Sequence, residues 1–241
     1  IGAFLYETGC DAAQMAMNPF LAILIPLLCA IAGSVLMGLI YSFLTVTLRA
    51  NQNVTGLALT TFGVGVTNYI ISQLEFVTFQ RGSRFFTASL PFASKLGWFG
   101  QIFLSYGFMV YLGIAIAVVA SLVLTKTRVG LHLRAVGENP ATADSAGINV
   151  NRYKYLATCI GCMIAGLGGL YYVMDYASGI WANNAFGDRG WLAIALVIFT
   201  VWRPNVGVLA SYLFGGLYIL HMYIPSGMNL AVKELYKMLL Y

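Results

Sequence analysis

Long apolar stretches without charge alternate with short polar connectors along the chain. Six long segments contain no Asp, Glu, Lys or Arg. About 20 predominantly apolar residues are needed for one helix to cross a bilayer, and five of the six segments reach that length. The pattern predicts an all-α, polytopic transmembrane helical bundle with about five full spans and one short half-helix. The uncharged segments are 12–48, 50–74, 96–125, 155–174, 190–202 and 204–232.

Polar and turn-forming residues set the expected bounds of the helices. The segment Trp191–Trp202 is apolar, but as a helix it is only about 18 Å long. Gly190 and Pro204 punctuate its two ends. We therefore predict a short helix that packs inside the protein instead of crossing the membrane. The predicted full spans are Pro19–Thr47, Val54–Phe79, Ile102–Leu124, Tyr155–Met174 and Val206–Tyr223.

Small residues recur one helical turn apart in the first and the fourth predicted spans. Such stripes let a second helix approach closely. The fourth span also contains the pattern C-x-x-C at Cys159 and Cys162. No second cysteine pair or histidine ligand lies near it in the sequence, so we predict no metal or redox site there. The two stripes are Ala30, Ser34 and Gly38, and Gly161, Ala165 and Gly169.

The composition indicates that a bilayer, not water, surrounds most of the chain. Of its 241 residues, 60% are hydrophobic and 9% are charged, and the mean hydropathy is +0.81. An ordinary soluble domain has about 25% charged residues, which this chain lacks. We predict one transmembrane domain over residues 1–241. Because the chain begins with Ile1 and ends within an apolar stretch, we expect the natural protein to be longer at both ends.

Positive charge is concentrated in the connector 125–154. Cytoplasmic loops of membrane proteins collect Lys and Arg, so the pattern predicts that 125–154 faces the cytoplasm and that 175–189 faces the opposite side. This bias explains the basic residues without a nucleic-acid partner. The basic residues of the connector are Lys126, Arg128, Arg134, Arg152 and Lys154.

The same connector contains the signals of one short helix. Asn139 suits the N-cap position and Pro140 the first helical position, while Gly147 suits the left-handed residue after the last turn. The enclosed helix, Pro140–Ala146, is too short to be stable alone. It requires a partner surface, on the rest of this protein or on another protein; the alternative is a solvated turn.

Three sequence motifs stand out, in the connector, at the start of the second predicted span and around the short apolar segment. Residues 130–140 read Gly-Leu-His-Leu-Arg-Ala-Val-Gly-Glu-Asn-Pro, followed by Ala-Asp at 143–144 and Ala-Gly-Ile-Asn-Val at 146–150. Residues 48–57 read Leu-Arg-Ala-Asn-Gln-Asn-Val-Thr-Gly-Leu, and residues 187–195 lead to Trp-Arg-Pro at 202–204. These motifs resemble those of the membrane permease subunits of ABC importers for sugars, nucleosides and branched-chain amino acids, and the chain is most similar to the nucleoside, or simple-sugar, type.

The resemblance implies a role for the connector. In such importers, a short cytoplasmic helix couples the permease to a separate ATPase, here the helix of 139–147. Arg134 and Glu138 are expected to pair with the ATPase or with each other one helical turn apart. The chain lacks the G-x-x-x-x-G-K-[ST] phosphate loop, so we expect no enzyme activity and no cofactor in this chain. The implied coupling residues are Arg134, Gly137, Glu138, Asn139, Pro140, Asp144 and Gly147.

The resemblance also implies the partners and the place of the protein. A complete permease of this group has about ten spans and lies in the bacterial inner membrane as a multi-pass protein. It translocates a nucleoside or a simple sugar; a branched-chain amino acid is the alternative. The implied partners are an ATP-binding ABC subunit that holds ATP and Mg²⁺, an identical or paralogous second permease subunit, an extracytoplasmic substrate-binding protein and the lipid bilayer.

Polar residues in the glycine-rich second span are candidates for the substrate path. Hydrogen bonds between helices are the other interpretation of these side chains. An ion-coupled secondary transporter is a further alternative for the whole protein. Such transporters usually place ionisable groups inside their spans, whereas Glu75, near the end of the second span, is the only Asp, Glu, Lys or Arg in the predicted spans. The candidate path residues are Thr60, Thr61, Thr67 and Asn68.

Overall fold

The computed structural model describes residues 2–12, 18–73, 78–88, 105–181, 186–187 and 189–220. As predicted, these residues form helices, with one isolated antiparallel bridge between Thr78 and Ile180. The chain divides into two compact units that alternate along the sequence. The first contains 1–113 and 128–185, and the second contains 114–127 and 186–241.

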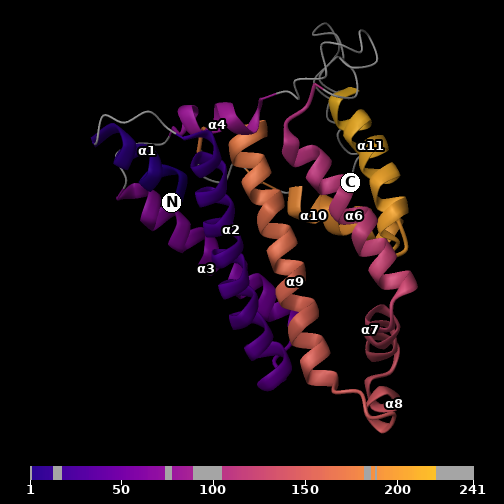
Figure 1. Ribbon diagram of the computed structural model, residues 1–241. Coiled ribbons are helices and arrows are strands. Elements are labelled where there is room, and N and C mark those ends of the chain that lie inside the picture. The colour runs from indigo at the N-terminus through magenta and orange to yellow at the C-terminus, as the bar shows by residue number, and fades with distance from the viewer. Residues whose placement is uncertain are drawn as a thin grey trace, which may run out of the picture. The chain divides into compact units, whose positions relative to one another are not determined.

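Most helices belong to the first unit (Figure 1). α2 and α9 each end in a π-helical turn, Phe43–Thr47 and Tyr172–Tyr176. α6, Phe108–Lys126, begins in the first unit and continues into the second, which also contains α10, Arg189–Phe199, and α11, Pro204–Leu220. The other helices are α1 Gly2–Ala12, α2 Pro19–Ser42, α3 Gln52–Ser72, α4 Gln80–Phe86, α7 Arg128–Glu138, α8 Pro140–Ser145 and α9 Val150–Tyr171.

Four helical segments of the described chain are long and apolar enough to cross a membrane. They correspond to the first four predicted spans. The predicted fifth span corresponds to α11, which is described as far as Leu220; residues 221–223 lie outside the described residues. The four segments are Pro19–Thr47, Gln52–Ser72, Phe108–Lys126 and Val150–Tyr176.

Several predicted span bounds differ from the structure; the helix of the fourth span, for example, begins at Val150 and not at Tyr155. The second span ends at Ser72, not at Phe79. Phe79 is buried outside the helix, where its N–H group donates to the Gly179 carbonyl at 2.8 Å, so tertiary packing removes it from the span. The third span begins at Phe108, because Ser105–Gly107 are not helical; residues 102–104 lie outside the described residues.

The predicted short helix is present as α10, but it ends at Phe199 and not at Trp202. It stops there because Val201 and Trp202 adopt left-handed backbone conformations, with φ of 50° and 57°. None of the residues of α10 is buried, so the expected packing inside the protein is not seen. In the part of the chain that the structure describes, Leu192 and Leu196 of α10 are half-buried, and its other apolar side chains are exposed. Within the second unit, Phe199 and Phe214 of α11 meet edge to face at 5.6 Å.

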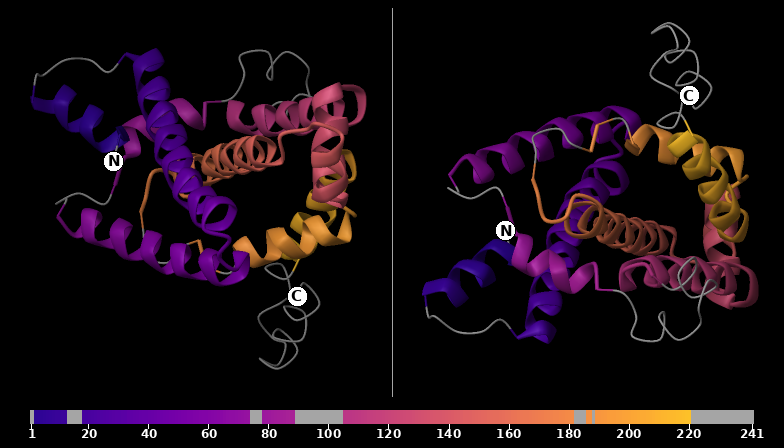
Figure 2. Two further views of the ribbon diagram at one scale, coloured as in Figure 1. Left: turned by 90° about the horizontal axis from the view of Figure 1, so that it is seen from below. Right: turned by 90° about the horizontal axis from the view of Figure 1, so that it is seen from above.

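α2 and α9 form the main helix pair of the first unit and lie side by side (Figures 1 and 2). A β-carbon added at Gly38 would lie 2.9 Å from the Cys162 β-carbon. Nearer the start of α2, Ser34 faces Gly166. Because higher numbers on α2 meet lower numbers on α9, the helices are antiparallel. The stripe predicted on α2 is therefore a close helix contact.

On α9, the close contact uses a different face from the predicted stripe. Cys159, Cys162 and Gly166 meet α2, whereas a β-carbon added at Gly161 or Gly169 would meet no atom within 4 Å. The two cysteines are free thiols, and they act here as small side chains at a helix interface.

The buried core of the first unit lies at the end of α9 away from α8 (Figure 1). There the Ser83 hydroxyl group of α4 donates to the Met174 carbonyl at 2.7 Å. The rings of Phe86 and Phe108 lie 5.5 Å apart. These contacts tie α4 and the start of α6 to the end of α9. The core residues are Ala3, Phe79, Phe86, Met109 and Met174.

Candidate functional site

The predicted N-terminal cap of α8 is present. Asn139 has an extended backbone, with φ −146°, and its Oδ1 accepts from the N–H groups of Ala141 and Thr142 at 3.1 and 3.2 Å. These bonds satisfy two donors that a helix start leaves without partners. Pro140 occupies the first helical position, where its missing N–H group costs nothing. The cap fixes where α8 begins.

The C-terminal end of α8 is closed by a Schellman motif. Gly147 has φ +79°, in the left-handed region that glycine tolerates best. Its N–H group donates to the Asp144 carbonyl at 2.9 Å, and the Ile148 N–H group donates to the Ala143 carbonyl at 3.0 Å. The predicted position and role of Gly147 in the backbone are therefore confirmed.

α8 rests on helices of its own chain through one side chain. Ala143 is 3% exposed, while the other residues of α8 are exposed. Its neighbours are α7 and α9, and α7 buries Val136. The chain thus supplies one partner surface for this short helix and leaves the remaining faces of α8 uncovered in the described structure.

A polar contact joins α7 to α9, and it was not anticipated from the sequence. The His132 Nδ1 atom and the Tyr153 hydroxyl group are hydrogen bonded at 2.9 Å, and their rings meet edge to face. Asn149 caps the start of α9 by accepting from the Arg152 N–H group at 3.0 Å. The sequence signal for the Asn149 cap was present, because Asn149 lies between Gly147 and an apolar helix. These contacts hold the loop that carries α8.

Arg134, Gly137 and Glu138 lie on α7 and are exposed. The predicted ion pair between Arg134 and Glu138 is not formed, both residues being within the described chain. An exposed pair one turn apart contributes only about 0.3–0.5 kcal/mol, which is too little to hold two long side chains together. Gly137 is helical and does not require a left-handed conformation.

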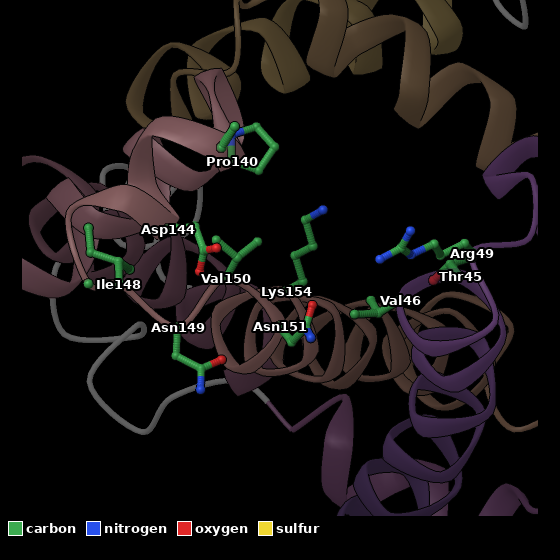
Figure 3. A pocket seen from close by; sticks show the side chains of 12 residues that line it. Thr45, Val46, Arg49, Pro140, Asp144, Ile148, Asn149, Val150, Asn151 and Lys154 are labelled. Atoms are coloured by element: carbon green, nitrogen blue, oxygen red, sulfur yellow. The ribbon is translucent and has the colours of Figure 1, made fainter.

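A groove of about 780 Å³ opens beside α8 (Figure 3). It is lined from three directions: the end of α2 with its π-helical turn, the α8 segment, and the first turn of α9. Three predicted coupling residues, Pro140, Asp144 and Gly147, line it. The other lining residues are Thr45, Val46, Arg49, Ala141, Ile148, Asn149, Val150, Asn151 and Lys154.

Two positive side chains point into this groove. Arg49 extends from the end of α2 and Lys154 from α9 (Figure 3). Arg49 has a φ of +53°, which is uncommon for a residue with a side chain. The hydroxyl groups of Thr47 and Tyr155, each close in sequence to one of the two cations, are hydrogen bonded to each other. In the sequence, Lys154 counts only as charge of the connector and Arg49 only as part of a motif, and neither signals that the fold brings the two together.

The candidate path residues lie on α3. Thr60 and Thr61 are exposed, and Thr67 and Asn68 are partly buried. The three threonine hydroxyl groups donate to carbonyl groups of α3 itself, for example Thr67 to Gly63 at 2.7 Å. None of these threonine bonds crosses to another helix. A β-carbon added at Gly63 would lie 3.6 Å from the Met37 side chain, so the face of α3 that contains Gly63 lies toward α2.

The family described as "Branched-chain amino acid transport system / permease component" matches residues 4–241. The chain is 32% identical to the guanosine ABC transporter permease protein NupQ of Bacillus subtilis, over 90% of this chain and 68% of that protein. It is also 32% identical to the nucleoside ABC transporter permease protein NupC of Lactococcus lactis, over 83% of this chain and 62% of that protein.

A third relative is the putative glucose ABC transporter permease protein TsgC13 of Haloferax volcanii. It is 31% identical over 77% of this chain and 56% of that protein. The chain therefore spans between 56% and 68% of the length of these three relatives. No solved structure matches the chain. The family match covers nearly all of the sequence, and four helices have the length and apolarity of membrane spans. The chain is an integral membrane protein that belongs to this family of transport-system permease components.

Proposed function

We propose that the chain forms the translocation path of an ATP-driven ABC importer for a nucleoside or a simple sugar. Its family membership supports the permease role. Two of the relatives are named as permeases for guanosine or nucleosides, and one as a putative glucose permease. The polar residues of α3 from Thr60 to Asn68 are proposed to line the path.

The single observation that supports coupling most directly is the construction of α8. It is closed by Asn139 at one end and by Gly147 at the other, although it has only six residues. Its side chains are exposed except for Ala143. The short turn after Gly147 leads directly into α9, which spans the membrane, so a force on α8 is transmitted to that helix. We propose that an ATP-binding subunit holds α8.

The same proposal assigns the other parts of the importer to separate chains. The ATP-binding subunit holds ATP and Mg²⁺ and performs the hydrolysis. A second permease subunit, identical or paralogous, completes the path, and an extracytoplasmic binding protein delivers the substrate. The exposed faces of α7, including Arg134 and Glu138, lie next to α8 in the chain and are proposed to contact the ATPase with it.

Replacement of Gly147 by Val tests the coupling role. A β-branched residue is strained at φ +79°, by about 1–2 kcal/mol, so the end of α8 should open while the membrane spans remain intact. Gly147→Asn is the matched control, because Asn tolerates the left-handed conformation. We expect Gly147→Val to insert normally but to lose ATPase association and uptake, and Gly147→Asn to keep most of both. Unchanged association and uptake in a stably inserted Gly147→Val protein would contradict the proposal.

Uptake of labelled compounds tests the substrate class. The permease, produced together with its ATPase and binding protein, should import guanosine or glucose only when the ATPase is active. Import of leucine in place of both would favour the branched-chain alternative. Uptake that persists with an inactive ATPase and collapses with the ion gradient would favour an ion-coupled transporter.

A further inference from the structure

The groove beside α8 contains two cations that the coupling proposal does not use. Arg49 and Lys154 both point into it (Figure 3). Within the described ranges, neither forms an ion pair, and Asp144, which also lines the groove, pairs with neither. Two like charges directed into one cavity repel each other unless an anion lies between them. With the Asp144 carboxylate counted against the two cations, the lining keeps one excess positive charge, which favours an anion in the groove.

The two cations are held in place by the backbone around them. The hydrogen bond between the Thr47 and Tyr155 hydroxyl groups ties the end of α2 to the first turns of α9. The Ala50 N–H group donates to the Leu44 carbonyl at 3.0 Å, which folds the chain back around Arg49. The left-handed backbone of Arg49 costs about 1–3 kcal/mol, and these contacts maintain it. The site is thus largely formed before any ligand arrives.

The position of the groove indicates the source of the anion. The spans Pro19–Thr47 and Val150–Tyr176 meet at this end of the helix pair. Arg49 follows the first span by two residues, and Lys154 is the fifth residue of the second. Both charges therefore lie at the level of the lipid head groups, where basic pockets between transmembrane helices bind anionic lipids.

The remaining lining fits a lipid better than a small inorganic anion. A volume of about 780 Å³ is far larger than one phosphate ion needs. Val46 and Val150 give the groove apolar walls, and Asn151 adds an amide group that suits a glycerol hydroxyl. Leu48 and Leu156, next to the groove in sequence, are 58% and 51% exposed and are available to acyl chains.

We propose that this groove, here called the Arg49–Lys154 groove, binds the phosphate of an anionic glycerophospholipid. The two cations hold the phosphate diester, and the acyl chains follow the apolar surface of the spans. The lipid would bridge the end of α2 and the start of α9 next to α8. Its binding does not require α8 to dock on an ATPase, because none of the contacts involves a second protein.

Lipid binding to the purified permease tests this site. The protein in an uncharged detergent is titrated with phosphatidylglycerol or phosphatidylcholine, and bound lipid is measured by native mass spectrometry. We expect phosphatidylglycerol to bind more tightly. Arg49→Gln and Lys154→Gln should each weaken its binding about fivefold, and the double variant about 25-fold, since one cation near a membrane surface contributes about 1 kcal/mol.

Arg152→Gln is the matched control. Arg152 is a cation on the same helix, two residues before Lys154, and it does not line the groove; its replacement should leave the dissociation constant unchanged. Arg49→Lys and Lys154→Arg keep the charge and should retain binding, which separates loss of charge from loss of fold.

Several outcomes would overturn the proposal. These are equal binding of the two lipids, wild-type affinity in the double variant, an equal loss in Arg152→Gln, or loss of binding in the charge-preserving variants. Complete competition by millimolar inorganic phosphate would assign the groove to a free ion and not to a lipid. If the double variant kept its lipid and lost only ATPase association, the cations would serve a protein partner instead.

Discussion

Gly166 of α9 lies against Ser34 of α2, so closely that a β-carbon at position 166 would overlap the Ser34 hydroxyl group. The added atom would also lie 2.6 Å from the Ser34 β-carbon and 3.3 Å from the Ala30 carbonyl oxygen. The Ser34 hydroxyl group donates to that carbonyl at 2.6 Å, so it fills the gap between the helices. The absence of a side chain at Gly166 therefore sets the distance between the two spans.

Replacing Gly166 by Val should separate α2 from α9. Overpacking of a close contact costs about 1–3 kcal/mol, and we expect a lower unfolding midpoint in detergent. Gly161→Val is the matched control, because it makes the same change on the same helix where no atom lies within 4 Å. An equal loss in both variants would show that helix propensity, and not the contact with Ser34, is responsible.

Replacing Asn139 by Ala should loosen the start of α8. Loss of an Asn cap costs about 0.5–2 kcal/mol of local stability, and the N–H groups of Ala141 and Thr142 lose their acceptor. Hydrogen exchange at these two amides should become faster, while exchange in α9 stays the same. Ser145→Ala, which removes a hydroxyl group that bonds within α8 itself, is the control. Unchanged exchange in Asn139→Ala would show that α8 is held by its neighbours alone.

Cysteine labelling tests the orientation of the connectors. In a protein whose native cysteines are replaced by Ala, an impermeant maleimide added outside intact cells should label Asn183→Cys and spare Thr142→Cys. The reason is the basic connector 125–154, which is expected on the cytoplasmic side. Thr142 is exposed on α8, whereas position 183 lies outside the described residues. The reverse labelling pattern would invert the orientation.

Replacing Asn68 by Leu tests the substrate path. If the Asn68 amide binds substrate, loss of its hydrogen bonds should raise the KM of uptake about 5- to 150-fold, following about 1–3 kcal/mol for a polar group left without a partner. Thr158→Val is the control, since this hydroxyl group bonds the Lys154 carbonyl on α9 and is not assigned to the path. A reduced amount of inserted protein with an unchanged KM would assign Asn68 to helix packing instead.

The parts of the fold that depend on local chemistry could be predicted from the sequence. The bounds of α8 follow from Asn139, Pro140 and Gly147, because caps and left-handed turns are decided by neighbouring residues. The four membrane spans follow from the length of their uncharged segments. The end of α3 could not be placed in this way, because apolar residues resume after Glu75 and continue to Phe79. The burial of Phe79 is decided by contacts with residues distant in the sequence.

For the contact between α2 and α9, the contacting face of α2 could be predicted from the sequence, but the contacting face of α9 could not. α9 offers two faces of small residues, and the sequence alone does not distinguish the face of Gly161 from that of Cys162 and Gly166. The Arg49–Lys154 groove could not be predicted from the sequence, for a related reason. Its cations come from distant segments, and an arginine with a left-handed backbone has no sequence signature.

The π-helical turn that ends α2 makes the residue count of this segment as important as its composition. The Leu48 N–H group donates to the Phe43 carbonyl, five residues back, so the turn holds one residue more than an α-helical turn. Each residue of an α-helix rotates the chain by about 100°. A deletion of one residue between Phe43 and Thr47 would thus rotate the residues that follow by about 100° relative to α2. Thr47 would turn away from Tyr155, and Arg49 would leave the groove, although every remaining side chain was unaltered.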